Sequence, residues 1–197
     1  VALYEQQKLK EFLETKIQSN KIDSIFLLLK KILVGKRRKV KKVFFSVGPG
    51  SFTAIRSIQA IAQGISVASN AEIITVTDFE IYLANLSKFK KNFSVFFETF
   101  NGYFFYQYFT LKKQKFFPKN KFCKGSNTDV LKFIINNKAN KDSLVITTNK
   151  KNFNFPKEFD KYEIIICEPS AKKIAVAIFE GYGQINQDII YHHTYYE

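Results

Sequence analysis

A glycine-rich loop between a short apolar run and a helical run is the part of the sequence best suited to chemistry. The loop reads Gly48-Pro49-Gly50, and the helical run starts directly after it. Backbone N–H groups at the start of a helix, together with the positive end of the helix dipole, can hold an anion. Both glycines can adopt positive φ angles, and Ser51 or Thr53 can cap the helix. The pattern therefore indicates either a tight structural turn or a phosphate site.

The side chains that a catalytic centre needs are missing around this loop. No Gly-Lys-Ser/Thr follows it, as in a Walker A loop, and its glycine spacing differs from that of a dinucleotide fingerprint. Histidine occurs only at positions 192 and 193, so no mid-chain His can activate a Ser or Cys nucleophile. The acidic residues are scattered, and no cluster of ligands indicates a metal. We therefore expect no catalytic residue, no metal site and no bound cofactor in the chain by itself.

Two amphipathic helices and two strands must position the loop. The apolar spacing predicts one helix over 19–33 and a second over 52–68, followed by a strand over 72–76 and a helix over 78–86. Gly64 lies inside the second helix, where a glycine costs about 1 kcal/mol relative to Ala. We therefore expect another helix backbone to approach Gly64 closely.

The second half of the chain predicts a sheet that is rich in aromatic residues. The run 93–111 is split by Asn101-Gly102, the strongest short signal for a hairpin. Its many Phe and Tyr side chains either fill the core of the hairpin or stack nucleic-acid bases. A helix over 127–137, strands over 144–147 and 163–167, and a helix from Ala171 to Gly181 complete the predicted elements.

The net charge of +14 has two explanations. It can serve nucleic acid or a membrane surface, or it can reflect biased composition, because Lys outnumbers Arg by 28 to 3. The densest basic run, 36–42, is either an RNA contact or a solvated turn. No stretch approaches the roughly 20 apolar residues of a membrane span. We expect a cytoplasmic protein with Cys123 and Cys167 as free thiols.

The loop and its surroundings resemble a known family. The string GPGSFTAIR over residues 48–56 closely resembles the GPGSFTGLR signature of the TsaB (YeaZ) family, and Thr75–Glu80 resembles that family's V(S/T)SLE segment. These proteins are non-catalytic partners in the bacterial synthesis of threonylcarbamoyladenosine in tRNA. The resemblance implies an α/β, actin-like (ASKHA, ribonuclease-H-like) fold of two lobes, 1–87 and 88–197. The family's opening strand, which ends in Asp-Thr-Ser, is absent from this sequence.

The resemblance also implies partners. The chain would pair with a TsaD-like threonylcarbamoyltransferase and, with a TsaE-like ATPase, support modification of the adenosine next to the anticodon. It would reach tRNA through that complex, a nucleotide could bind at the interface of the complex, and the chain alone could form a homodimer. The motif loop would contact a phosphate or the partner through Gly48, Pro49, Gly50, Ser51, Phe52, Thr53 and Arg56. The partner interface would comprise Ile22, Ile25, Phe26, Leu29, Ile32, Ala54, Ile58, Ile61 and Ile65.

Two other functions fit parts of the sequence. The first is a nucleotide- or phosphate-binding enzyme of the sugar-kinase-like superfamily, which would use the Gly48-Pro49-Gly50 loop as its phosphate site. The second is an RNA-binding module, which would use the basic loop 36–42.

Overall fold

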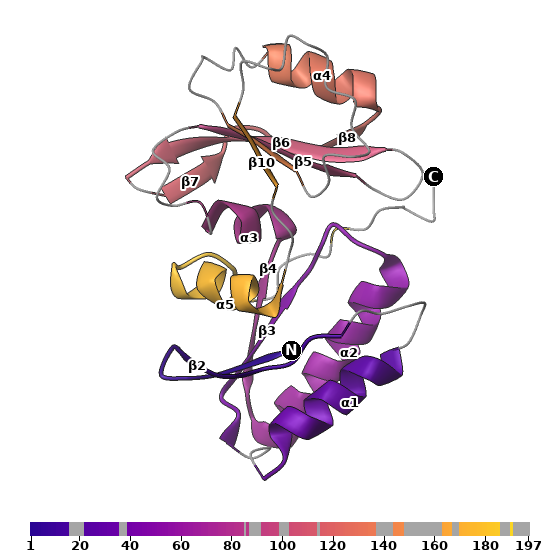
Figure 1. Ribbon diagram of the computed structural model, residues 1–197, viewed down its shortest axis with the longest axis vertical. Helices are drawn as coiled ribbons and strands as arrows, with labels where there is room; N and C mark the ends of the chain where they lie inside the picture. Colours follow the sequence, from indigo (N-terminus) through magenta and orange to yellow (C-terminus); the bar gives the residue numbers. More distant parts are fainter. Residues whose placement is uncertain are drawn as a thin grey trace. The chain divides into compact units, whose positions relative to one another are not determined.

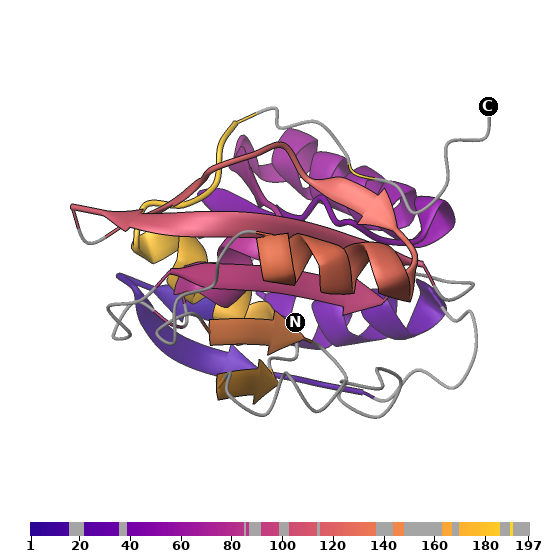
Figure 2. The ribbon, with the colours of Figure 1, turned by 90° about the horizontal axis from the view of Figure 1, so that it is seen from above.

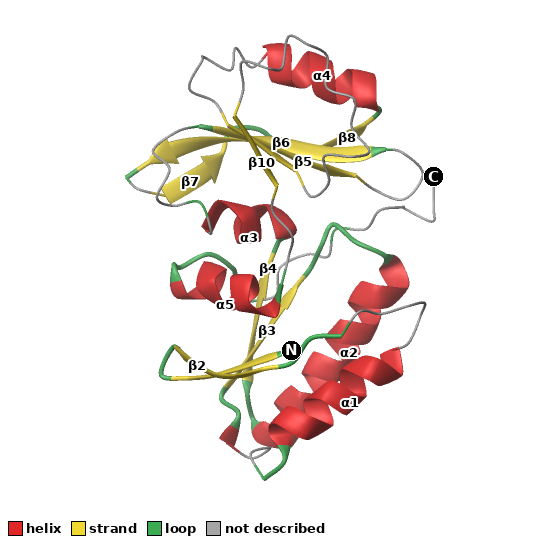
Figure 3. Cartoon of the chain, viewed as in Figure 1, coloured by secondary structure: helices red, strands yellow, loops and turns green. Residues whose placement is uncertain are grey.

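The chain forms two compact units, each built around its own strands (Figures 1 and 3). Unit 1 comprises Val1–Ile81 and Ser170–Glu197, and unit 2 comprises Tyr82–Pro169. The structure is a computed structural model, and the residues it describes are 1–15, 22–35, 39–84, 86, 92–98, 103–113, 115–136, 144–147, 163–166, 170–185 and 190.

Unit 1 contains two pairs of strands. β3 (Lys42–Ser46) and β4 (Glu72–Val76) run parallel, and α2 (Phe52–Ser69) connects them as a crossover helix. β1 (Ala2–Glu5) and β2 (Lys8–Phe12) form an antiparallel hairpin. Within the described ranges, the two pairs are separate two-stranded sheets. The strand–loop–helix–strand order predicted around the glycine-rich loop is confirmed.

The side chains of β3 alternate between two helices. Phe45 and Val47 pack with Ala62 of α2 in one buried cluster. Phe44 points to the other face, where its ring centroid lies 6.0 Å from that of Phe179 in the last helix. This alternation follows from the period of two along a strand, and it leaves β3 covered by a helix on each face.

The last helix belongs to unit 1. α5 (Ala171–Phe179) packs on β3 and β4, and its Phe179 ring also lies 5.3 Å from the ring of Tyr4 in β1. The compact units therefore differ from the expected lobes 1–87 and 88–197. The difference arises because the apolar face of α5 packs on the strands that carry the loop, although the sequence of unit 2 separates them.

Two helices lie side by side along one edge of unit 1. α1 (Ile22–Leu33) runs next to α2, and residues of both line one shared groove (Figure 1). Gly35, with φ +65°, follows the end of α1. The hydroxyl of Ser51 accepts from the Ala54 N–H at the start of α2, and Asn70 ends α2 in the left-handed region.

Unit 2 is built around a six-stranded mixed sheet. Its strands are β5 (Phe93–Glu98), β6 (Phe104–Lys112), β7 (Lys115–Pro118), β8 (Cys123–Gly125), β9 (Leu144–Thr147) and β10 (Glu163–Ile166). The order is β10-β9-β5-β6-β7, with β8 also paired to β6. β5 and β6 pair antiparallel as predicted, while the turn at Asn101-Gly102 lies outside the described residues. The strands β7 and β8 were not predicted.

The aromatic residues of this sheet form much of its core. α4 (Asn127–Asn136) covers one face, where Val130 and Ile134 pack against Phe96 and Phe104 (Figure 2). On the other face the Phe97 ring lies 5.8 Å from that of Tyr82, which belongs to α3 (Asp78–Ala84). Of the two roles expected for the aromatic run, core packing therefore holds for these residues.

Candidate functional site

The glycine-rich loop is tightly enclosed by its own chain. Gly48 has φ +96°, and the Gly48–Pro49 peptide bond is cis. A Cβ atom at Gly48 would lie 2.5 Å from the carbonyl oxygen of Ile190 and 2.9 Å from Cδ1 of Ile55. Both the backbone conformation and the close approach of these neighbours therefore require glycine here.

The amide donors of the loop are used within the chain. The Gly48 N–H donates to Ser46 Oγ at 3.1 Å, and the Gly50 N–H donates to the carbonyl oxygen of Ile190 at 3.1 Å. The Ile190 N–H in turn donates to the carbonyl oxygen of Val47 at 2.9 Å. An anion cradle needs such donors to point at the ligand. Of the two interpretations of the loop, this arrangement favours the tight structural turn.

A buried carboxyl group holds the loop from the other side. Asp78 Oδ1 accepts from Ser46 Oγ at 2.5 Å, and the Asp78 N–H donates to the Gly48 carbonyl oxygen at 2.8 Å. Burial raises the pKa of the Asp78 carboxyl to about 6, while the hydrogen bond from Ser46 lowers it. Next to it, the Thr77 hydroxyl and the Glu80 carboxylate form a capping box at the start of α3. Sequence analysis placed Asp78 only within the Thr75–Glu80 segment and at the start of a helix, and gave its carboxyl no role in the loop.

The remaining motif residues lie on the exposed start of α2. The Arg56 guanidinium lies 5.6 Å from the centroid of the Phe52 ring and also donates to Gln59 Oε1 at 3.3 Å. Thr53 accepts from the Ser57 hydroxyl through its carbonyl oxygen. The start of α2 is exposed at Phe52, Thr53 and Arg56, whereas the loop is buried at Gly48 and Pro49.

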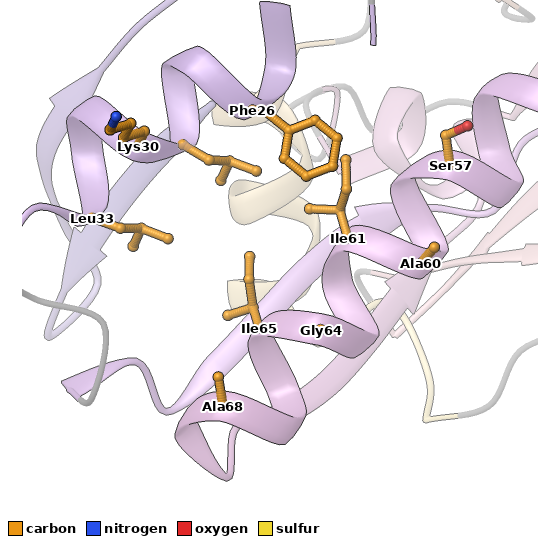
Figure 4. A pocket seen from close by; sticks show the side chains of 10 residues that line it. Phe26, Lys30, Leu33, Ser57, Ala60, Ile61, Gly64, Ile65 and Ala68 are labelled. Atoms are coloured by element: carbon orange, nitrogen blue, oxygen red, sulfur yellow. The ribbon is translucent and has the colours of Figure 1, made fainter. Parts of the chain in front are cut away.

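The second candidate feature is the groove between α1 and α2, called here the α1–α2 groove. It has a volume of about 700 Å³. Figure 4 shows Phe26 and Leu33 of α1 facing Ile61 and Ile65 of α2 across this space, with Gly64 and Ala68 along the α2 side. The lining residues are Phe26, Leu29, Lys30, Leu33, Ser57, Ala60, Ile61, Gly64, Ile65 and Ala68. Most of these side chains are apolar, so the groove offers little for catalysis but suits an apolar partner.

The predicted interface residues separate into three groups in this structure. Four line the α1–α2 groove: Phe26, Leu29, Ile61 and Ile65. Two are packed inward, because Ile32 is only 1% exposed and Ile58 joins the cluster under α2. Of the others, Ala54 is exposed at the start of α2, Ile25 is partly buried, and the side chain of Ile22 is outside the description. The inward positions follow from the wide apolar face of α1 and from the packing of α2 on β3.

The position of Gly64 is not explained by a close neighbour among the described residues. The sequence predicted a closely approaching helix backbone, but a Cβ atom at Gly64 would meet no described atom within 4 Å. That expectation is wrong for the described residues, because α1 lines the groove opposite Gly64 with larger side chains. Leu33 and Ala60 lie within the helix stretches 22–33 and 54–66 that the family resemblance implies as a docking face, whereas Ala68 lies beyond them. Ala60, Gly64 and Ala68 recur every four residues and so share one helix face.

The other candidate sites contribute little. No group of three or more metal-binding side chains occurs in the parts of the chain that are described. His192, His193, Cys167 and the first three residues of the basic run 36–42 lie outside those parts. Farther along that run, Lys42 pairs with Glu72 at 3.1 Å. None of the described helices is both long and apolar enough to cross a membrane.

Comparison with known proteins places the fold. No protein-family model and no curated protein matches the chain. Among solved structures, the chain is similar to an uncharacterized protein with similarity to peptidase YeaZ from Pseudomonas aeruginosa, with a TM-score of 0.68 and 14% identity over 93% of this chain and 88% of that one. It is also similar to YeaZ from Pseudomonas aeruginosa, with a TM-score of 0.66, 15% identity and the same coverage. The chain therefore has the mixed α/β fold of YeaZ structures, which agrees with the resemblance of its loop to the TsaB (YeaZ) family.

Proposed function

We propose that the chain is a non-catalytic, TsaB-like subunit for threonylcarbamoyladenosine modification of tRNA. In this proposal its two units are the lobes of an actin-like (ASKHA) fold. It pairs with a TsaD-like threonylcarbamoyltransferase through the α1–α2 groove, and a TsaE-like ATPase acts with the pair. The modified base is the adenosine next to the anticodon. The tRNA and any nucleotide are bound by the complex, and the nucleotide lies at its interface. The GPGSFT string and the YeaZ-like fold support this proposal.

The observation that carries the proposal is the unfilled α1–α2 groove. Phe26 at its α1 side is 54% exposed, and Gly64 at its α2 side meets no described atom of its own chain. Leaving a large apolar side chain in water and a glycine inside a helix both cost free energy. A partner helix that packs into the groove would bury Phe26 and would need the space that Gly64 leaves open.

The proposed role of the chain is to hold its partner in one conformation. A binding partner shifts a conformational equilibrium only by as much as its affinity for the two states differs. The loop supports such a role, because hydrogen bonds hold both of its ends. Asp78 bonds to Ser46, at the end of β3, and Ile190 bonds to Gly50, just before α2. The loop then serves to position α2, and through α2 the groove.

Two substitutions on neighbouring residues of α2 test the docking surface. Gly64→Leu places a side chain in the groove where the chain has open space, so the protein should fold and gain about 0.5 to 1 kcal/mol of helix stability. We expect its affinity for a TsaD-like subunit to fall roughly 30-fold or more, as at an interface hot spot. Copurification, light scattering and calorimetry measure the complex and its affinity.

Gln63→Leu is the matched control, because Gln63 is exposed on α2 and does not line the groove. This variant should bind the partner as the parent chain does. Reconstituted threonylcarbamoyl transfer to tRNA should require the parent chain and should fail with Gly64→Leu. If no complex with a TsaD-like subunit forms, or if both variants bind equally well, the proposal is wrong.

A further inference from the structure

The β6–β7 hairpin of unit 2 carries an ordered set of basic and aromatic side chains. The strands are antiparallel, with Lys112 opposite Lys115 and Thr110 opposite Phe117. One step farther, the Lys119 N–H donates to the Tyr108 carbonyl oxygen, which places these two residues opposite each other. Directly opposed residues have side chains on the same face, and alternate residues along a strand return to it. These six residues, called here the lysine–aromatic array, therefore share one face.

Burial shows which face of the hairpin is open. Phe117 is 47% exposed, whereas Phe116, on the opposite face, is only 4% exposed. Within the array Tyr108 is itself only 5% exposed, so the open part of this face comprises Phe117 and the three lysines. The Lys119 ammonium lies 5.7 Å from the centroid of the Tyr108 ring, which confirms that both residues are on the array's side. Figure 2 shows that α4 lies over part of this sheet and that the β6–β7 hairpin extends beyond it.

The charge of the array is uncompensated within the described part of unit 2. Lys112, Lys115 and Lys119 are exposed, and none of them forms an ion pair with a described residue. Every second residue of β7 has its side chain on the array's face, which places Lys115, Phe117 and then Lys119 in a row. Lys115 and Lys119 are about 13 Å apart along the strand, with the Phe117 ring between them.

We propose that the lysine–aromatic array binds single-stranded RNA. A single strand presents phosphates alternating with bases, and a groove or sheet that binds it without sequence preference combines lysines with exposed aromatic rings. Phe117 would stack a base, and the three lysines would contact the flanking phosphates. The inference concerns the chain by itself and does not depend on the partner bound at the α1–α2 groove, although it would give the proposed subunit a direct contact with its tRNA.

The lysines are tested by charge reversal in the full chain. The triple variant K112E/K115E/K119E should bind a fluorescein-labelled oligouridylate at least tenfold more weakly than the parent chain. The slope of log affinity against log salt concentration should become shallower by about 2, because each phosphate contact of a single strand contributes roughly 0.7. Fluorescence anisotropy over a range of salt concentrations measures both quantities.

The matched control has the same net charge. K8E/K41E/K132E reverses three exposed lysines on β2, before β3 and on α4, and it should keep the parent affinity and slope. Equal loss of binding in both triple variants would show that only net charge matters, and it would overturn the proposal. Undetectable binding of the oligouridylate by the parent chain at low salt would also overturn it.

Base stacking on Phe117 is tested by substituting two phenylalanines that are exposed to a similar extent. Phe117→Leu keeps an apolar side chain but removes the ring, and it should weaken binding on the order of tenfold. Phe122→Leu should not, although Phe122 is also exposed, at 44%, in unit 2.

Vesicles of phosphatidylcholine with phosphatidylserine test a different anionic surface. If the array lysines control vesicle binding and leave RNA binding unchanged, the partner is a membrane and the proposal is wrong.

Discussion

Burial of one carboxyl group couples the glycine-rich loop to pH. Asp78 is enclosed beside Ser46, and burial raises the pKa of its carboxyl from 3.8 to about 6. The folded state therefore holds this proton more tightly than the unfolded state does. Its stabilising contribution is fully present below pH 3.8 and is lost as the pH rises through 6. A shift of this size corresponds to about 3 kcal/mol.

This linkage predicts the behaviour of Asp78→Asn. Asparagine is neutral at every pH and can still accept from the Ser46 hydroxyl, so the variant lacks the cost of a buried charge at high pH. We expect its free energy of unfolding, relative to the parent chain, to rise by about 2 to 3 kcal/mol between pH 4 and pH 8. Urea unfolding followed by circular dichroism at a series of pH values measures the difference.

Asp129→Asn provides a control of opposite sign. Hydrogen bonds from the hydroxyl and the N–H of Ser126 hold the pKa of the exposed Asp129 carboxyl below its usual value. The stabilising contribution of Asp129 is therefore present above the unfolded pKa and lost as the pH falls. Relative to the parent chain, Asp129→Asn should lose stability as the pH rises. The same sign for both variants would contradict the assignment of the buried carboxyl.

At the scale of elements, α5 joins the two strand pairs of unit 1. The Phe179 ring contacts Tyr4 of β1 and Phe44 of β3, while these strands have no ladder between them in the described chain. Aromatic contacts in such edge-to-face geometry add to the stabilisation from burial. Among the described residues, the Phe179 ring therefore links β1 to β3.

Phe179→Ala should lower the free energy of unfolding of unit 1 by about 3 kcal/mol, because it removes both ring contacts and leaves a cavity. The urea transition of unit 1 measures this change. Val67→Ala is the control, since Val67 is 88% exposed on α2 and its substitution should change stability by less than about 0.5 kcal/mol. A similar effect of both substitutions would show that α5 does not join the strand pairs.

For the whole molecule, an unfilled groove predicts self-association. The chain alone exposes the apolar α1–α2 groove, and a second copy could cover it with the same surface in a two-fold dimer. We expect the sedimentation coefficient of the purified chain to rise with concentration. Gly64→Leu should keep the chain monomeric at the same concentrations, while Gln63→Leu should not. Concentration-independent sedimentation of the parent chain would contradict this prediction.

Local signals determined much of unit 1 in advance. Short stretches of sequence contain the apolar spacing of the two helices, the restart of the chain after Gly48-Pro49-Gly50 and the glycine at position 64. The structure has α1, the loop and α2 where these stretches predicted them. The hairpin of β5 and β6 was equally clear from its turn. Such elements depend on propensity and periodicity, which neighbouring residues set among themselves.

The tertiary structure alone decided how these elements are used. Only folding brings the Ile190 carbonyl oxygen to the Gly50 N–H, encloses Asp78, returns α5 to unit 1 and aligns Lys112 with Lys115. Each of these depends on contacts between residues that the sequence separates or on the register of two strands. For the first three, no short window contains both partners, and for Lys112 and Lys115 only the register of β6 and β7 sets the pairing. The sequence therefore determined the loop and the helices, and packing determined which amide donors, carboxyl groups and surfaces remained open to other molecules.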